Sequence, residues 1–383
     1  MGGSQTGAGN LQRDGMTTRA TELRQAAYPA LDGLRCYAVL LVFLVHLLGG
    51  LLTEYYRIPE DQISVGSPVS GIAALTFLAD GHHGVDIFFL ISGFLMARIA
   101  RPGMSWARFV GRRWLRIYPA FLASLVLTTA AYVWLYDWPF QLRDFLLNLV
   151  FYNAWPGHGI IAYNHVTWSL GYEFAFYLLV PALAAWRWPG LRGAVAVAMA
   201  LAALLLLPPP LPRMSGLFAG FALGCVADGG LRKVAARVPV WLVVGAYCAL
   251  VWVKTLAPLE FRTFHQLLLP IAALLIVCIV FGNNPLNRFF ASKPMRVLGQ
   301  WSYSIYLFHP LVISLVIYDL LDWTGLRSQP LFAVPFICIG AALLTVLVAA
   351  ASYALFEAPY FRRRQPRPCV NVQPTAVTDS RVS

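Results

Sequence analysis

Two residues that are costly to bury in a membrane, Arg35 and His46, stand eleven residues apart in the first strongly apolar stretch of the chain. On an α-helix, with 100° of rotation and 1.5 Å of rise per residue, both side chains lie on one face, roughly 16 Å apart along the axis. A guanidinium group can hold phosphate, and an imidazole can act as a general base or a nucleophile. The spacing therefore predicts a functional site that runs along one face of a membrane helix.

A basic segment, RIARPGMSWARFVGRRWLRIYP, carries six arginines between residues 98 and 116. Arg113 and Arg116 are three residues apart, so on a helix both guanidinium groups can reach one ligand. Arginine suits bidentate binding of phosphate, and Arg35 lies on the same side of the membrane in the topology derived below. The alternative is contact with anionic lipid headgroups, which a basic loop at a membrane surface makes in any case.

Other polar side chains interrupt the apolar stretches further along the chain. His82, His83 and Asp86 precede or begin the stretch GVDIFFLISGF, and His309 lies in WSYSIYLFHP. The His-His-x-x-Asp pattern has no third ligand pattern to support it, so we expect no metal and favour an acceptor-lining or structural role. His309 can either relay protons or form a hydrogen bond between helices.

Membrane helices are the elements that must position these residues. The 383 residues are 59% hydrophobic and 12% charged, and the mean hydropathy is +0.64. A soluble domain cannot bury that much apolar surface, so the composition predicts an all-α, polytopic membrane bundle. The net charge of +12 could suggest a nucleic-acid partner. In a membrane protein it more often reports topology, and we expect no nucleic acid.

About ten apolar spans are expected, and the charges between them predict an orientation. With the N-terminus inside, only six of the 29 Lys and Arg lie on external segments, which leaves 23 on cytoplasmic ones. The positive-inside rule therefore predicts that both termini are cytoplasmic. The expected spans are residues 34–53, 84–100, 117–136, 168–186, 192–208, 214–228, 240–257, 266–282, 300–320 and 330–356.

This orientation places His46 and Glu173 at similar depth in the outer half of the bilayer. His46 lies roughly 9 Å from the outer end of the first span, and Glu173 lies roughly 8 Å from the outer end of the fourth. A carboxylate at that level can fix the tautomer of an imidazole and raise its basicity. We therefore expect the two to pair as catalytic residues. The alternative is a separate packing contact for each.

One transmembrane domain, residues 30–361, is expected between two disordered cytoplasmic tails, residues 1–29 and 362–383. Segment 143–156, RDFLLNLVFYNAWP, is too short and too polar at its ends for a span, and we expect it to be interfacial or re-entrant on the outer face. An additional span there would invert everything downstream and spoil the alternation of charge.

Five segments together resemble the acyltransferase 3 family of integral membrane acyltransferases, and they occur in the order typical of that family. The Arg-x10-His signature of the family falls on Arg35 and His46, its Arg-x-x-Arg on Arg113 and Arg116, and its Trp-Ser-Leu-x-x-Glu on residues 168–173. The matching segments are LDGLRCYAVLLVFLVH (31–46), GVDIFFLISGFLMARI (84–99), RFVGRRWLRIYP (108–119), WSLGYEFAFYLLVP (168–181) and LGQWSYSIYLFHPLV (298–312).

The resemblance implies transfer of an acyl group, acetyl by default, from cytosolic acyl-coenzyme A. The implied acceptor is a hydroxyl of a carbohydrate, a lipid-linked cell-envelope glycan or a small molecule at the outer face of the bacterial inner membrane. Relatives differ in carrying a C-terminal esterase-like domain, and this chain is expected to be the stand-alone form. Arg35, Arg113 and Arg116 would hold coenzyme A. His46 would act as general base or accept the acyl group, with Glu173 orienting it.

Direct transfer and an acyl-histidine intermediate both stay open at this point. The rival function is a proton-coupled transporter or flippase of a glycolipid or small metabolite, because intramembrane His, Glu and Arg also mark proton relays. Discontinuous helices in corresponding positions of two halves would favour the rival, and the sequence indicates none. The residues that we expect to bind the acceptor are Asp86, Trp168, His83, Tyr306 and His309.

Overall fold

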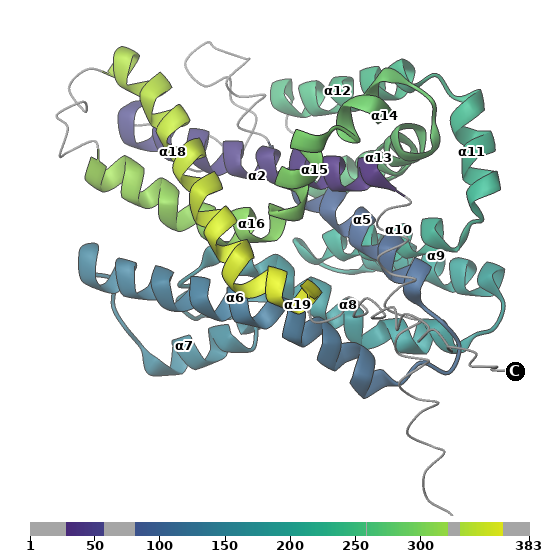
Figure 1. The fold of residues 1–383 in the computed structure, drawn as a ribbon, viewed down its shortest axis with the longest axis horizontal. Coiled ribbons are helices and arrows are strands. Elements are labelled where there is room, and N and C mark those ends of the chain that lie inside the picture. Colours follow the sequence, from purple (N-terminus) through teal and green to yellow (C-terminus); the bar gives the residue numbers. More distant parts are fainter. Residues whose placement is uncertain (1–27, 57–80, 258, 321–329, 363–383) are drawn as a thin grey trace, which may run out of the picture.

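The computed structural model describes residues 28–56, 81–257, 259–320 and 330–362. Within these ranges the chain forms helices and no strands, so the prediction of an all-α protein is confirmed (Figure 1). The two expected tails, residues 1–29 and 362–383, lie almost wholly outside the described residues.

The helices pack as one bundle, with α2 and α5 crossing near its centre in Figure 1. Short 3-10 turns precede two of them: Gly81–His83 leads into α5, and His165–Thr167 leads into α8. The α-helices are α2 (Pro29–Tyr56), α5 (Gly84–Ile99), α6 (Trp106–Leu135), α7 (Leu142–Leu149), α8 (Trp168–Ala185), α9 (Pro189–Leu206), α10 (Ser215–Cys225), α11 (Asp228–Arg237), α12 (Val240–Leu256), α13 (Phe261–Phe281), α14 (Pro285–Phe290), α15 (Lys293–Gln300), α16 (Ser302–Ser314), α18 (Pro330–Ser352) and α19 (Ala358–Arg362).

Each of the ten expected spans coincides with a helix or with a bent pair of helices. By length and composition, six described helices can cross a membrane, and the number rises to eight if each bent pair counts as one span. The two remaining expected spans are α5, with 16 residues, and α12, with 17. Both are shorter than the roughly 20 residues typical of a span, and α12 lies at the lower limit of the observed range. The polytopic helical architecture is thus as predicted, with fewer full-length spans.

Two of the expected spans are broken rather than continuous. The helices Leu211–Cys225 and Asp228–Arg237 meet at 104°, and Lys293–Gln300 and Ser302–Asp319 meet at 68°. The sequence predicts continuous spans over residues 214–228 and 300–320, because mean apolarity does not register a bend. Both breaks lie in the second half of the described chain, so they are not in corresponding positions of two halves, as an inverted-repeat transporter requires.

Helix α5 is held in place by close packing against α10. A Cβ atom at Gly93 would lie 2.0 Å from the carbonyl oxygen of Leu217, and one at Gly220 would lie 2.1 Å from that of Leu90. Glycines at these positions let the two backbones approach closely, as small residues do in membrane bundles. The tight contact fixes which face of α5 is turned away from α10.

The segment expected to be interfacial contains α7, which has only eight residues, and a 3-10 turn at Tyr152–Ala154. It is therefore too short to cross a membrane, as predicted. Two buried polar side chains tie it to the following loop. The backbone N–H of Ile161 donates to Oδ2 of Asp144 at 2.9 Å, and Nδ2 of Asn148 donates to the carbonyl oxygen of Ile161 at 2.7 Å.

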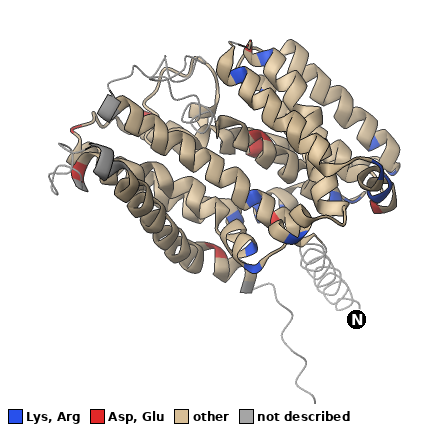
Figure 2. Ribbon diagram, turned by 90° about the horizontal axis from the view of Figure 1, so that it is seen from above, with Lys and Arg blue, Asp and Glu red and all other residues tan. Residues whose placement is uncertain are grey.

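The outside of the bundle is strongly apolar. Leu127, Trp134, Leu206 and Leu347 are among many large hydrophobic side chains that are exposed. Figure 2 shows long stretches of helix that carry no charged residue. A surface of this kind suits the hydrocarbon core of a bilayer.

Candidate active site

A cavity of about 290 Å³ lies inside the bundle, between α2, α5, α6, α8, α16 and the C-terminal segment. Its lining is basic at one end: six arginines face two carboxylates, Glu173 and Glu357. Arg101, on the exposed loop between α5 and α6, marks this end. The six arginines are Arg35, Arg98, Arg101, Arg112, Arg113 and Arg116.

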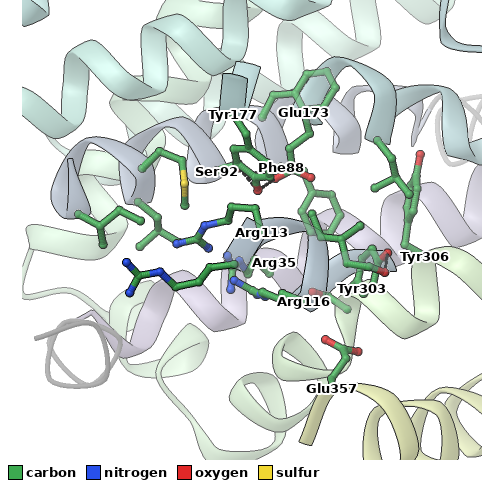
Figure 3. A pocket seen from close by; sticks show the side chains of 18 of the residues that line it. Arg35, Phe88, Ser92, Arg113, Arg116, Glu173, Tyr177, Tyr303, Tyr306 and Glu357 are labelled. Carbon is green, nitrogen blue, oxygen red and sulfur yellow. Dashed lines mark hydrogen bonds between the residues drawn. The ribbon is translucent and has the colours of Figure 1, made fainter. Parts of the chain in front are cut away.

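The three arginines singled out by spacing, Arg35, Arg113 and Arg116, come together in this cavity (Figure 3). Aromatic rings, rather than carboxylates, support two of them. The guanidinium carbon of Arg113 lies 5.5 Å from the ring centroid of Phe109, and that of Arg116 lies 5.5 Å from the ring centroid of Phe361. A ring face holds the cation without occupying its N–H donors, so the donors remain available to an anion.

An unused donor supports the same conclusion. The Nε atom of Arg113 is buried and has no hydrogen-bond partner among the described residues. Arg35 has a longer contact, with its Nη1 atom 3.7 Å from Oδ1 of Asp32 one turn earlier on α2. Buried donors in folded proteins are nearly always paired, so Arg113 has a donor that a ligand in the cavity could engage.

Glu173 lies in the cavity wall and is engaged there. Its Oε1 atom accepts hydrogen bonds from Ser92 Oγ of α5 and from Tyr177 OH, both at 2.5 Å (Figure 3). The expected pairing of Glu173 with His46 is not found among the described residues. The depth argument considered only the position along each helix. The rotation of α8 about its axis directs the carboxylate towards α5 instead.

His46 belongs to a group of histidines that lies beyond the end of the cavity opposite the arginines. Its ring centroid lies 4.9 Å from that of His309, 5.2 Å from that of His165 and 6.2 Å from that of His82. The Nδ1 atom of His46 is 3.1 Å from Nε2 of His309. His309 is fully buried and His46 is partly buried, whereas His82 and His165 are exposed, so the group leads from the bundle interior to the surface.

Tyr306 connects the cavity with this histidine group. Its side chain lines the cavity, on the side opposite the arginines in Figure 3, and its ring centroid lies 5.9 Å from that of His309. The hydroxyl group donates to the carbonyl oxygen of Val166 at 2.6 Å and shares a hydrogen bond of 2.7 Å with Ser169 Oγ. These bonds hold the ring between the cavity and the imidazoles.

Three other residues expected to bind the acceptor lie away from the cavity lining. Asp86 is buried at the start of α5, where its Oδ2 atom is 3.5 Å from Nε2 of His265 on α13. His83 is also buried, with its ring 5.4 Å from that of Tyr247. Trp168 stacks under the guanidinium group of Arg213, whose central carbon is 5.5 Å from the ring centroid. Their role in acceptor binding stays a prediction.

Several residues of the site escaped the sequence analysis. His165 lies in a 3-10 turn, where no helical spacing relates it to His46. His265 has no spacing relation to Asp86, because 179 residues separate them along the chain. Ser92 and Tyr177, the partners of Glu173, look like ordinary packing residues in apolar helices. Within the described ranges, no group of three or more His, Cys, Asp or Glu is arranged to hold a metal ion.

Comparison with known proteins gives a consistent set of relatives. The model of the acyltransferase domain family matches residues 28–350. The chain is 30% identical to the acyltransferase MdmB of Streptomyces mycarofaciens, over 76% of this chain and 80% of that protein. It is also 30% identical to the exopolysaccharide production protein ExoZ of Rhizobium meliloti, over 75% of this chain and 93% of that one.

A further relative is longer. The chain is 25% identical to the peptidoglycan O-acetyltransferase OatA of Listeria monocytogenes, over 78% of this chain but only 51% of that protein. The chain therefore spans about half the length of this relative. No solved structure matches the chain.

Proposed function

The chain belongs to the acyltransferase domain family, and from this premise we propose that it transfers an acyl group from acyl-coenzyme A to a hydroxyl group of a cell-envelope carbohydrate. The observation that carries the proposal is the single continuous arrangement of an arginine-lined cavity, Tyr306 and the pair of His46 and His309. The arginines suit the phosphates of the donor, and the imidazoles suit the transfer chemistry.

The donor end of the site supports acyl-coenzyme A as co-substrate. Six guanidinium groups line the cavity with two carboxylates, and Asp228 and Asp32 outside the lining pair with Arg98 and Arg35. The positive charge that remains is one that a polyphosphate would neutralise. The pantetheine arm would then extend along α5, past Ser92, towards Tyr306. Phe88 to Arg98 on this helix covers a rise of roughly 15 Å, at 1.5 Å per residue. A flexible thioester arm, rather than a compact anion, suits a cavity of that length.

Orientation follows from the basic loops. Arg98, Arg101, Arg112 and Arg116 mark the cytosolic face under the positive-inside rule, so we place the donor cavity there and both termini in the cytoplasm. The exposed histidines, His82 and His165, would then lie at the outer face of a bacterial inner membrane. In this arrangement the acyl group moves outward while coenzyme A stays on the cytosolic side.

The chemistry at His46 would proceed with its ring as general base. The acceptor oxygen attacks the thioester carbonyl carbon, the new O–C bond forms and the C–S bond breaks. The imidazole takes the hydroxyl proton, which passes to the departing thiolate, so that coenzyme A leaves as the thiol. Exclusion of water by the surrounding helices would protect the thioester from hydrolysis.

The names of the relatives guide the acceptor class. One relative is a peptidoglycan O-acetyltransferase and another an exopolysaccharide production protein, so we propose a surface glycan as acceptor and acetyl as the transferred group. A macromolecular or lipid-linked sugar at the outer face would approach through the side where His82 and His165 are exposed. Glu173 would act on the donor side, as the carboxylate that positions Ser92 and Tyr177 in the cavity.

Purified protein in lipid nanodiscs, with labelled acetyl-coenzyme A and peptidoglycan or exopolysaccharide fragments, tests the proposal. We expect thioester consumption that depends on the acceptor, with label recovered as an alkali-labile ester. His46→Ala should bind the donor and fail to transfer the label. Wild-type protein that neither binds nor consumes acetyl-coenzyme A would contradict the donor assignment, and full activity in His46→Ala would contradict the role of His46.

A further inference from the structure

The two imidazoles at the end of the cavity have defined hydrogen-bonding roles. We infer that His309 is a positioning residue that holds His46 in the tautomer with an unprotonated Nε2 atom. We also infer that His309 accepts the Nδ1 hydrogen of His46 while that ring is positively charged. The inference rests on the proposed function for its kinetic consequences, but the tautomer itself follows from hydrogen-bond geometry.

The proton on His309 can be assigned first. Its Nδ1 atom is 3.1 Å from the carbonyl oxygen of Ile305, one turn earlier on α16. A carbonyl oxygen only accepts, so Nδ1 must carry the hydrogen. A neutral imidazole has one N–H group, and the ring of His309 is fully buried, where the charged form is costly. The Nε2 atom of His309 is therefore a hydrogen-bond acceptor.

The proton on His46 follows from the same reasoning. Its Nδ1 atom lies 2.8 Å from the carbonyl oxygen of Val42 and 3.1 Å from Nε2 of His309. Both neighbours are acceptors, so Nδ1 carries a hydrogen that the two share. The lone pair of neutral His46 is then on Nε2, which no hydrogen bond within the described ranges engages. A general base or nucleophile needs a free lone pair of this kind.

His309 also matters once the reaction begins. When Nε2 of His46 takes the acceptor proton, the ring becomes an imidazolium, and its Nδ1–H becomes a charged donor. Hydrogen bonds with an ionised partner are shorter and roughly twice as strong as neutral ones. The bond to His309 therefore strengthens as charge develops on His46, and an interaction that strengthens in this way lowers the barrier.

Val42 alone does not supply this function. Its carbonyl oxygen already accepts hydrogen bonds within α2 and cannot move relative to His46, whereas the His309 side chain reaches across from another helix. The contact from α16 also fixes the ring rotation of His46. Loss of His309 should therefore lower kcat and leave the donor KM almost unchanged, because the arginine end of the cavity remains intact.

Two substitutions at His309 test the inference in the full-length protein. In His309→Gln the amide oxygen can still accept from Nδ1 of His46, while His309→Leu keeps a side chain of moderate volume without an acceptor. We expect kcat to fall about 10- to 100-fold in His309→Leu, as for other groups that orient a functional histidine, and we expect His309→Gln to recover most of that loss. The donor KM should change less than about twofold in both.

Phe308→Leu is the matched control, because this neighbouring side chain on α16 is buried and carries no acceptor. Its kcat should equal that of the wild type when the rate is divided by the number of folded molecules. Binding of labelled acetyl-coenzyme A counts these molecules. Wild-type kcat in His309→Leu would overturn the inference. Equal loss in His309→Gln and His309→Leu would overturn the acceptor role of His309.

Nitrogen-15 NMR of the histidine rings in wild-type protein tests the tautomer without any activity. The signals of His46 are assigned by their loss in His46→Gln, and we expect a protonated Nδ1 and an unprotonated Nε2. A protonated Nε2 in the resting protein would overturn the inference even if His309→Leu failed to fold. Absence of acyl transfer with the expected tautomer would instead contradict the proposed function and leave the positioning contact in place.

Discussion

His46 on α2 and His265 on α13 share the same local geometry but have different hydrogen-bonding partners. In both His46 and His265, Nδ1 lies close to the carbonyl oxygen four residues earlier, at 2.8 Å and 2.6 Å. This contact leaves Nε2 as the nitrogen that meets the surroundings. In His265 it faces the carboxylate of Asp86 at 3.5 Å, whereas in His46 it is unengaged within the described ranges.

The difference in partners separates a structural histidine from a reactive one. His265 has its Nδ1 atom against the backbone, and its Nε2 atom faces the Asp86 carboxylate of α5. This buried contact connects α5 with α13 and turns Nε2 of His265 towards a carboxylate. His46 has a neutral partner, His309, and stays partly exposed. A local hydrogen bond can therefore set the tautomer, while the tertiary partner decides whether the ring is available for catalysis.

Substitution of His46 should give the largest functional effect. We expect His46→Ala to reduce acyl transfer by about 10² to 10⁴-fold, the contribution typical of a general base. Binding of labelled acetyl-coenzyme A should persist, because the arginine-lined cavity does not include His46. Transfer assays and binding assays on the same preparation measure the two quantities. If the transfer activity of His46→Ala stayed within a few fold of wild type, His46 would be a structural histidine like His265.

Breaking the Asp86–His265 pair should affect stability instead. Either Asp86→Leu or His265→Leu leaves one buried polar side chain without its partner, and we expect a loss of about 1 to 3 kcal/mol in the free energy of unfolding. The double substitution should be less destabilising than either single one, because no unpaired buried polar side chain remains. Thermal unfolding in detergent measures the stability. Low activity in a well-folded double variant would show that the pair also takes part in catalysis.

Substitutions in the arginine cluster should separate donor binding from transfer. Arg113→Gln and Arg116→Gln each remove a charged donor to phosphate, for which the expected loss is about 1.5 to 3 kcal/mol, or roughly 10- to 100-fold in donor KM. The effect on kcat should be small, in contrast to His46→Ala. Arg108→Gln is a matched control, since this exposed arginine lies on the same helix outside the cavity lining. An unchanged KM in both test variants would assign these arginines to lipid contact.

Glu173→Gln should have the smallest effect of the four. The amide oxygen can still accept from Ser92 and Tyr177, so only the difference between charged and neutral hydrogen bonds is lost, about 1 kcal/mol or severalfold in activity. A variant that cannot accept, Glu173→Leu, should lose more. Steady-state kinetics on both variants decide the matter. Inactivation of Glu173→Gln as complete as that of His46→Ala would place the carboxylate in the transfer step.

Local features account for the parts of the site that were predictable. Arg113 and Arg116 share a cavity because a three-residue spacing on one helix determines their common face. The apolar stretches were found for a similar reason, since hydropathy is a property of short segments. The bends between α10 and α11 and between α15 and α16 were missed, because the composition of a segment does not determine its direction.

The sequence by itself therefore determined an all-helical protein with apolar spans, the family signatures and the positions of Arg35, His46 and Glu173 along their helices. Only the tertiary structure decided which side chains meet. Glu173 turned to Ser92, and His46 met His309 across a separation of 263 residues. Helical periodicity relates residues within one segment, whereas the rotation and crossing of helices depend on packing such as that between Gly93 and Leu217, which no single segment encodes.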